Sequence, residues 1–371
     1  MTQLHTLYET YGQSPWIDNI RRDWLDDGTL ASMVGDGVRG VTSNPSIFAK
    51  TLSTSSAYDE SIAQHATMDL EALFETLAVA DVRDACDVLA GVHASARDDV
   101  ASGRRRYSDG FVSLEVSPRL ANDTEATISA AHRLAGAVDR PNVMIKIPAT
   151  LEGLPAITAV LGAGINVNVT LIFSLQRYSQ VLDAWMSGLE FAAANGHDLA
   201  SLASVGSFFV SRVDTAIDPM LADGDPRRGT SAIAQGARAY QLYRDRTAGE
   251  RCAALLAAGA QVQRPLWAST SVKNPAYPEL LYVESLVADE TVDTMPDATL
   301  AAARDHGNFA DSPLLDPITT SAKAAELDDL PPQVSLDEVT AHLETDGVAS
   351  FAAAYEDLLE TLAKKLDHPE A

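Results

Sequence analysis

The stretch Asn142-Val-Met-Ile-Lys-Ile-Pro148 is an apolar run with a single charge, Lys146, inside it. Apolar side chains at successive positions are typical of a strand in a parallel sheet that is covered on both faces. An ammonium group is costly to desolvate there, so burial weakens its hold on its proton. A lysine that is neutral near pH 7 is a nucleophile that forms Schiff bases with carbonyl groups. A lysine that protects an edge strand from aggregation is the alternative, and this segment alone slightly favours it.

Similar short runs alternate with helix-like stretches along the chain. The predicted strands are residues 16–20, 40–43, 111–116, 142–147, 166–173, 205–210, 265–269 and 281–287. Eight strands interleaved with helices indicate an α/β fold, a (β/α)8 TIM barrel of about 250 residues. The surplus predicts extra N-terminal and C-terminal helices around one domain, residues 1–371, with a helical extension at 305–371. A doubly wound open sheet is the alternative fold.

The tail contains a helix start signal and an apolar stripe. Ser335 and Glu338 have the spacing of a capping box and follow two prolines. Apolar residues at helical spacing around Phe351 give the last helix one apolar face. We expect this helix to pack on the outside of the barrel, and a lid over its mouth is the alternative.

The composition limits the partners and the location of the protein. The net charge of −25 repels phosphate, so we expect no nucleic acid and no membrane as partners. A phosphate ligand would need a few local cations. Two cysteines, Cys86 and Cys252, form no disulfide framework, and the N-terminus lacks an apolar signal core. These features predict a cytoplasmic protein.

Several common motifs are absent or misplaced. Gly35-Asp-Gly-Val-Arg-Gly40 matches G-x-G-x-x-G but precedes a predicted strand instead of following one, so it does not indicate a dinucleotide site. The chain has no P-loop, no H-E-x-x-H and no G-x-S-x-G motif. Its scattered histidines predict no metal site.

Polar side chains lie in or just after most of the predicted strands. In a (β/α)8 barrel the catalytic groups come from the C-terminal ends of several strands. We therefore expect one site to contain Asp18, Asn44, Glu115, Lys146, Asn168, Thr170, Ser207, Arg212, Ser269, Ser271 and Lys273.

The residue types fit one chemistry. An amine nucleophile needs a nearby carboxyl group to move protons, and Glu115 can do this through a water held by Thr170. Asp18 can serve as a second acid and base, although a surface acid paired with neighbouring arginines is the simpler interpretation of the sequence. The amides and hydroxyls suit a polyol, and Arg212 with Lys273 suits a phosphate.

Five segments in this order resemble transaldolase, over about residues 14 to 300. They are Gly40-Val-Thr-Ser-Asn-Pro-Ser46, Ser113-Leu-Glu115, Met144-Ile-Lys-Ile-Pro148, Asn166-Val-Asn-Val-Thr-Leu-Ile-Phe-Ser174 and Ala268-Ser-Thr-Ser-Val-Lys-Asn274. The resemblance implies a class I aldolase without metal or cofactor, acting on sugar phosphates as a monomer or homodimer. The implied reaction moves a dihydroxyacetone unit from sedoheptulose 7-phosphate or fructose 6-phosphate to glyceraldehyde 3-phosphate or erythrose 4-phosphate.

The resemblance also implies a role for each residue. Lys146 corresponds to the Schiff-base lysine, Asp18 to the acid and base of carbon–carbon cleavage, and Glu115 with Thr170 to the pair that holds the catalytic water. The implied substrate-binding residues are Asn44, Asn168, Ser207, Arg212, Ser269, Ser271 and Lys273.

One loop departs from the family pattern, and two other functions stay open. The family often has Ser-Phe-Arg-Asn where this chain has Ser271-Val-Lys-Asn274, which replaces a bidentate cation by a point charge. The alternatives are a fructose-6-phosphate aldolase, which releases free dihydroxyacetone, and a sugar-phosphate-binding protein without catalytic activity.

Overall fold

The computed structural model describes residues 1–367 of the protein, which is built around a closed parallel barrel. Seven strands form one sheet in the order β1-β7-β6-β5-β4-β3-β2, and every neighbouring pair is parallel. Val41 makes a parallel bridge to Ile17 in β1 and another to Val112 in β2, so it occupies the eighth position and closes the cylinder. The predicted (β/α)8 barrel is confirmed. The strands are β1 (Ser14–Ile17), β2 (Val112–Glu115), β3 (Val143–Pro148), β4 (Val167–Ile172), β5 (Ser204–Phe209), β6 (Arg264–Ala268) and β7 (Val292–Met295).

The last predicted strand, residues 281–287, is wrong. Its first part forms helix α14 (Leu281–Ser285), and the true last strand is β7, which begins eleven residues after the predicted start. The apolar run at 281–287 is buried as a helix and turn, and a short apolar run does not distinguish a buried helix from a strand. The sequence of β7, Val-Asp-Thr-Met, does not indicate a strand, because two of its four residues are polar although they are buried in the barrel wall.

Helices surround the barrel, and their starts follow the capping chemistry of the sequence. α10 begins after Ser174, whose hydroxyl accepts a hydrogen bond from the Arg177 N–H (3.1 Å), as its N-cap position predicts. The longer helices are α1 (Gln3–Tyr11), α4 (Pro45–Thr54), α6 (Leu70–Val88), α7 (Ala90–Ala101), α8 (Thr124–Val138), α9 (Gly153–Gly162), α10 (Leu175–Ala194), α12 (Ser231–Ala248), α13 (Glu250–Ala257), α15 (Asp297–His306), α16 (Pro317–Ala325) and α17 (Leu336–Asp367). The shorter ones are α2 (Arg22–Asp26), α3 (Thr29–Gly35), α5 (Asp59–Gln64), α11 (Ser211–Ile217) and α14.

A buried ion network closes the N-terminal end of the barrel. The Asp109 carboxylate accepts hydrogen bonds from Ser14 (2.5 Å), Trp16 (2.9 Å), Arg39 (2.9 Å) and Arg264 (3.3 Å). Burial alone would raise the pKa of Asp109, but the two guanidinium groups hold it below its ordinary value. This network links β1 and β6 to the segments that precede Val41 and β2, so it fixes the end of the barrel opposite to the site.

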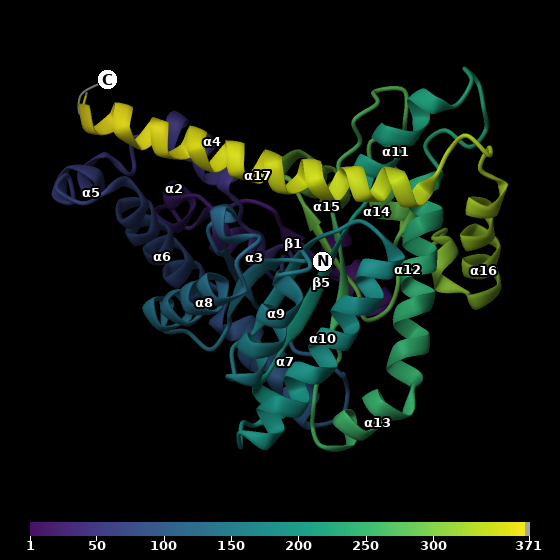
Figure 1. Ribbon diagram of the computed structural model, residues 1–371, viewed down its shortest axis with the longest axis horizontal. Helices are drawn as coiled ribbons and strands as arrows, with labels where there is room; N and C mark the ends of the chain where they lie inside the picture. Colours follow the sequence, from purple (N-terminus) through teal and green to yellow (C-terminus); the bar gives the residue numbers. More distant parts are fainter. Residues whose placement is uncertain (368–371) are drawn as a thin grey trace.

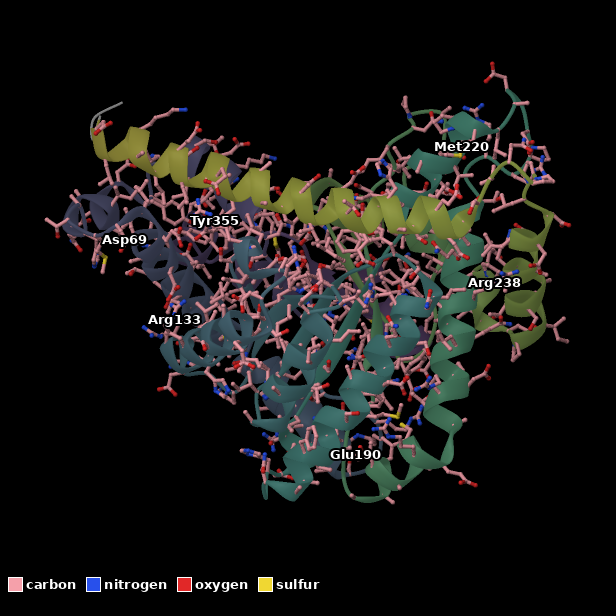
Figure 2. All side chains as sticks on the ribbon, in the orientation of Figure 1. Asp69, Arg133, Glu190, Met220, Arg238 and Tyr355 are labelled. Atoms are coloured by element: carbon pink, nitrogen blue, oxygen red, sulfur yellow. The ribbon has the colours of Figure 1, made fainter. Side chains whose placement is uncertain are left out.

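The C-terminal helix lies over the other end. α17 crosses the molecule beside α4, α6 and α11 and contacts β4 (Figure 1). Gly347 permits this approach, because a Cβ at that position would lie 3.2 Å from Leu171 and Phe173 at the end of β4. Tyr355 is buried on the face of the helix that packs on the body of the protein (Figure 2). The expectation that this helix packs on the outside of the barrel wall is therefore wrong. No helix within residues 1–367 is both long and apolar enough to cross a membrane.

Candidate active site

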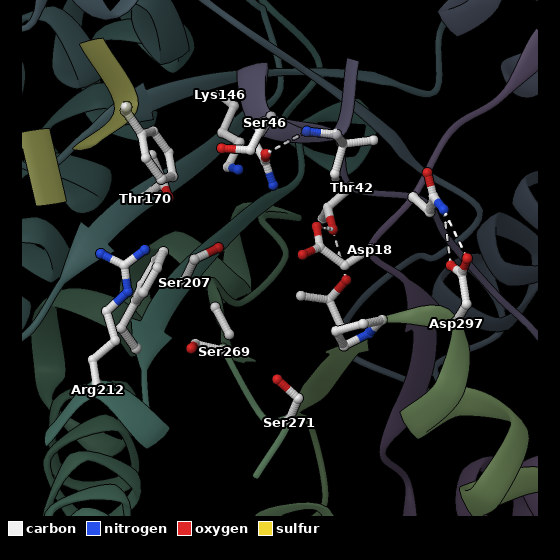
Figure 3. Close-up of a pocket in the computed structure, with 18 of the residues that line it drawn as sticks. Asp18, Thr42, Ser46, Lys146, Thr170, Ser207, Arg212, Ser269, Ser271 and Asp297 are labelled. Atoms are coloured by element: carbon white, nitrogen blue, oxygen red, sulfur yellow. Dashed lines mark hydrogen bonds between the residues drawn. The ribbon is translucent and has the colours of Figure 1, made fainter. Parts of the chain in front are cut away.

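A cavity of about 510 Å³ lies at the C-terminal ends of the strands, beneath α17. Figure 3 shows side chains from both halves of the chain converging on it. All the predicted site residues line this cavity except Glu115 and Asn168: Asp18, Asn44, Lys146, Thr170, Ser207, Arg212, Ser269, Ser271 and Lys273.

Lys146 on β3 lines the cavity. Every residue of β3 is buried, and Lys146 is 5% exposed, so its ammonium group must find partners inside the protein. Its Nζ donates to the Ser43 carbonyl oxygen (3.0 Å) and lies 3.2 Å from a Glu115 carboxyl oxygen. The strand register explains this pairing, because Glu115 in β2 lies opposite Lys146 in β3. The alternative of an edge strand is excluded, since β3 lies between β2 and β4.

Glu115 can both give and take a proton near neutral pH. Burial raises its pKa to about 7, the Lys146 ammonium opposes this shift, and the Asp18 charge adds to it. Glu115 does not line the main cavity; it borders a neighbouring one of about 280 Å³ between β2, α6 and α17. It reaches the main site through its contact with Lys146.

Thr170 offers a free hydroxyl to the cavity. Its side chain is fully buried, and its Oγ1 has no hydrogen-bond partner within residues 1–367. Buried hydroxyls are almost always hydrogen bonded, so this one is suited to a ligand or a water in the cavity that it lines.

Asp18 belongs to the site and not to the surface. Its Oδ1 accepts a hydrogen bond from the Thr42 hydroxyl (2.6 Å), as Figure 3 shows. The neighbouring Arg21 and Arg22 pair instead with Asp23 and Asp81. Burial raises the pKa of Asp18, while Lys146 and the Thr42 hydrogen bond lower it. The interpretation of Asp18 as an ordinary surface acid is therefore wrong.

Of the two asparagines predicted to bind substrate hydroxyl groups, one lines the cavity and the other does not. Asn44 caps α4 by accepting from the Ile47 N–H (3.1 Å), and its side chain lines the cavity. Asn168 is fully buried and does not line the cavity; its amide donates to the Ser113 hydroxyl (3.0 Å) and its oxygen accepts from Ser207 (2.7 Å). Asn168 thus orients the Ser207 hydroxyl, whose oxygen remains open to the cavity.

Arg212 and Lys273 bring two positive charges to the wall of the cavity. Burial lowers the pKa of Lys273, and the nearby charge of Arg212 lowers it further. Within residues 1–367 neither cation forms an ion pair, while Lys273 donates to Ser271 (2.6 Å). Ser269 adopts a left-handed backbone, with φ of 58°, and contacts the Ser211 hydroxyl (2.9 Å). Strained backbone is common at functional sites, and an anion would relieve the repulsion between the two cations.

The structure adds residues that the sequence did not indicate. Phe351 on α17 forms part of the cavity wall and places its ring 5.7 Å from the Lys146 Nζ. Lys50 on α4 and Thr294 on β7 also line the cavity. Polar residues in or just after apolar runs mark the strand ends in the sequence, whereas no local signal shows which distant helix covers them. Within residues 1–367 no three His, Cys, Asp or Glu side chains are grouped as metal ligands.

Comparison with known proteins agrees with this geometry. A family model described as transaldolase/fructose-6-phosphate aldolase matches residues 15–362. A curated relative named "Transaldolase 1" from Streptomyces coelicolor is 49% identical over 96% of this chain and 93% of its own length. "Transaldolase" from Saccharopolyspora erythraea is 47% identical over 96% of both chains, and "Transaldolase" from Thiobacillus denitrificans is 46% identical over 94% of this chain and 96% of its own. This chain therefore belongs to the transaldolase/fructose-6-phosphate aldolase family.

Proposed function

We propose that this protein is a transaldolase that carries a dihydroxyacetone unit on Lys146, from a ketose phosphate to an aldose phosphate. The observation that carries the proposal is that the buried Lys146 amine, which lines the cavity, lies 3.2 Å from the carboxyl group of Glu115 directly behind it. The cavity itself holds the carboxyl group of Asp18 and two cations, Arg212 and Lys273, without carboxylate partners in the described chain.

The first stage forms the Schiff base. Neutral Lys146 attacks the C2 carbonyl of fructose 6-phosphate or sedoheptulose 7-phosphate, giving a carbinolamine. Glu115, through a water held by Thr170, protonates the leaving hydroxyl group, so that water departs and an iminium ion remains. A pKa of about 7 keeps Glu115 partly protonated at neutral pH, which suits an acid that must also act as a base when the imine is hydrolysed.

The second stage breaks the C3–C4 bond. Asp18 removes the C4 hydroxyl proton, the C4 carbonyl forms, and the bonding electrons move into the iminium to give an enamine. The aldose phosphate leaves and an acceptor aldose phosphate takes its place. The reverse steps then build a new ketose and release Lys146.

The substrate binds between two polar regions. We assign the phosphate to Arg212, Lys273, Ser269 and Ser271, and the dihydroxyacetone hydroxyls to Asn44 and Ser207, with Asn168 supporting Ser207 from below. Lys273 contributes a point charge, which attracts a phosphate without fixing its orientation. We assign the orientation of the phosphate to Arg212, whose guanidinium group can bind in a bidentate manner.

Borohydride reduction in the presence of fructose 6-phosphate tests the proposal. We expect a stable adduct on the peptide that contains Lys146, detected by mass spectrometry. Lys50 lines the same cavity, so its peptide is an internal control for non-specific labelling. An adduct on Lys50, or none on either lysine, would refute the mechanism.

The family also includes fructose-6-phosphate aldolases, and acceptor dependence separates the two reactions. We expect turnover of fructose 6-phosphate to require an aldose phosphate acceptor such as erythrose 4-phosphate. Release of stoichiometric free dihydroxyacetone without an acceptor would identify an aldolase instead. A cytoplasmic location and a monomeric or homodimeric state belong to the same proposal.

A further inference from the structure

Two threonine hydroxyl groups form a chain that ends on Asp18. Thr42 Oγ1 lies 2.6 Å from Asp18 Oδ1 and 2.6 Å from Thr294 Oγ1. Both threonines line the cavity and are almost fully buried, at 2% and 3% exposure. Thr42 follows the bridge residue Val41, and Thr294 lies in β7. These two segments are the neighbours of β1 on its two sides, so the hydrogen bonds connect them across β1.

The direction of these hydrogen bonds is fixed by proton counting. An ionised carboxylate only accepts hydrogen bonds, so Thr42 must give its single proton to Asp18. Thr42 then has no proton left for Thr294, so Thr294 must donate to Thr42. Consecutive hydrogen bonds that point the same way polarise one another, which strengthens the bond to the carboxylate.

We propose that Thr294 and Thr42 form a hydroxyl relay that positions Asp18 and presents its Oδ2 as the oxygen that takes the C4 hydroxyl proton. The proposal rests on the transaldolase mechanism above. Oδ1 is occupied by Thr42, while no hydrogen bond within residues 1–367 reaches Oδ2. Thr294 forms no hydrogen bond with the side chain of Lys146 or Asp18 and is bonded to Thr42, so it is a positioning residue that acts through Thr42.

Other charges also act on Asp18. Lys146 on β3 and Lys273 after β6 lower its pKa, whereas burial and Asp297 on α15 raise it. Asp297 is held by two hydrogen bonds from Asn19 (2.9 and 3.0 Å). None of these groups is altered by a substitution at Thr294, so the relay can be tested without changing the other charges.

The test measures carbon–carbon cleavage as a function of pH. Rapid mixing of enzyme with fructose 6-phosphate gives a burst of glyceraldehyde 3-phosphate whose rate falls at low pH as Asp18 is protonated. We expect Thr294→Val to move this acidic limb upward by about 0.5 pH unit, and Thr42→Val by about 1 unit, because the direct bond to a charged group is the stronger one. Thr294→Ser retains the hydroxyl and should reproduce the wild-type limb.

Two further results distinguish a relay from general disturbance. The double variant Thr42→Val/Thr294→Val should behave like Thr42→Val alone, since Thr294 acts only through Thr42. The yield of borohydride-trapped adduct on Lys146 should not change in Thr294→Val, because Schiff-base formation precedes the step that uses Asp18.

The proposal fails if Thr294→Val has the wild-type limb, or if the two substitutions shift the limb additively. Thr294→Ala supplies the same comparison if the valine variant does not fold. A wild-type enzyme that gives neither adduct nor burst would overturn the proposed function itself, whereas an active wild type with an unaltered Thr294→Val profile would overturn only the relay.

Discussion

Asp293 gives a quantitative prediction, because it is a buried carboxyl group with no cation beside it. It is fully buried in β7; Thr270 donates a hydrogen bond to its Oδ1 (2.8 Å), and its Oδ2 has no partner within residues 1–367. Burial raises its pKa from the ordinary 3.8 to about 7, and the Thr270 hydrogen bond opposes the shift only in part. The charged form therefore destabilises the folded state.

The size of this effect follows from the shift. A group whose pKa is raised on folding loses its stabilising contribution as pH rises from the unfolded value, 3.8, through the folded value, about 7. The difference of about three pKa units corresponds to roughly 4 kcal/mol, which is fully developed by pH 8. Asp293→Asn has nearly the same shape, keeps an acceptor for Thr270 and does not titrate.

We therefore expect Asp293→Asn to match the wild type in unfolding free energy near pH 4 and to exceed it by about 4 kcal/mol near pH 8. Urea denaturation followed by circular dichroism at several pH values between 4 and 8 measures this. Leu or Ala would also remove the charge but would change the packing, so Asn is the appropriate variant. A stability difference that is independent of pH would refute the reasoning.

Three other perturbations test separate parts of the molecule. Asp109→Ala leaves Arg264 buried without its partner and should lower the unfolding free energy by about 3–5 kcal/mol, measured by urea denaturation; a loss below about 1 kcal/mol would contradict the network. Lys273→Ala should raise KM for phosphorylated ketoses more than it lowers kcat, and an unchanged KM would remove Lys273 from the phosphate site. Phe351→Ala opens the space above Lys146 to water, so free dihydroxyacetone should increase roughly tenfold relative to transfer product, assayed by chromatography, because water exclusion protects reactive intermediates. An unaltered ratio would show that the ring does not shield the enamine.

The sequence predicts the site residues that lie on strands adjacent both in sequence and in the sheet. Lys146 and Thr170 are polar residues in apolar runs, and the parallel register of β3 and β4 brings their strands together without further information. Asp18 was ambiguous, because sequence neighbours suggested arginine partners, and only the tertiary structure shows those arginines paired elsewhere.

The parts that were not predictable depend on long-range packing or on polar strands. The sequence does not predict β7, because its two polar residues, Asp293 and Thr294, interrupt the apolar pattern on which strand prediction depends. Thr294, one of the two residues of the hydroxyl relay, therefore could not be predicted as a site residue. The position of Phe351 over Lys146 depends on the path of α17, and the close approach at Gly347 has meaning only once β4 is in place. An apolar stripe shows that a helix is covered, without showing by what.

The single-residue bridge at Val41 has a consequence for local unfolding. Three backbone hydrogen bonds join the segment around Val41 to each neighbour: Arg39 N to Pro15 O, Ile17 N to Gly40 O and Thr42 N to Ile17 O toward β1, and Gly110 N to Arg39 O, Val41 N to Phe111 O and Ser113 N to Val41 O toward β2. Segments held by few backbone hydrogen bonds open with less free energy than the whole domain requires. The amide protons of Val41 and Thr42 should therefore exchange with solvent faster than those in the centre of β3. Because Thr42 binds Asp18 and the Ser43 carbonyl oxygen binds Lys146, each such opening would separate the catalytic groups, and a bound substrate that bridges them should slow the exchange.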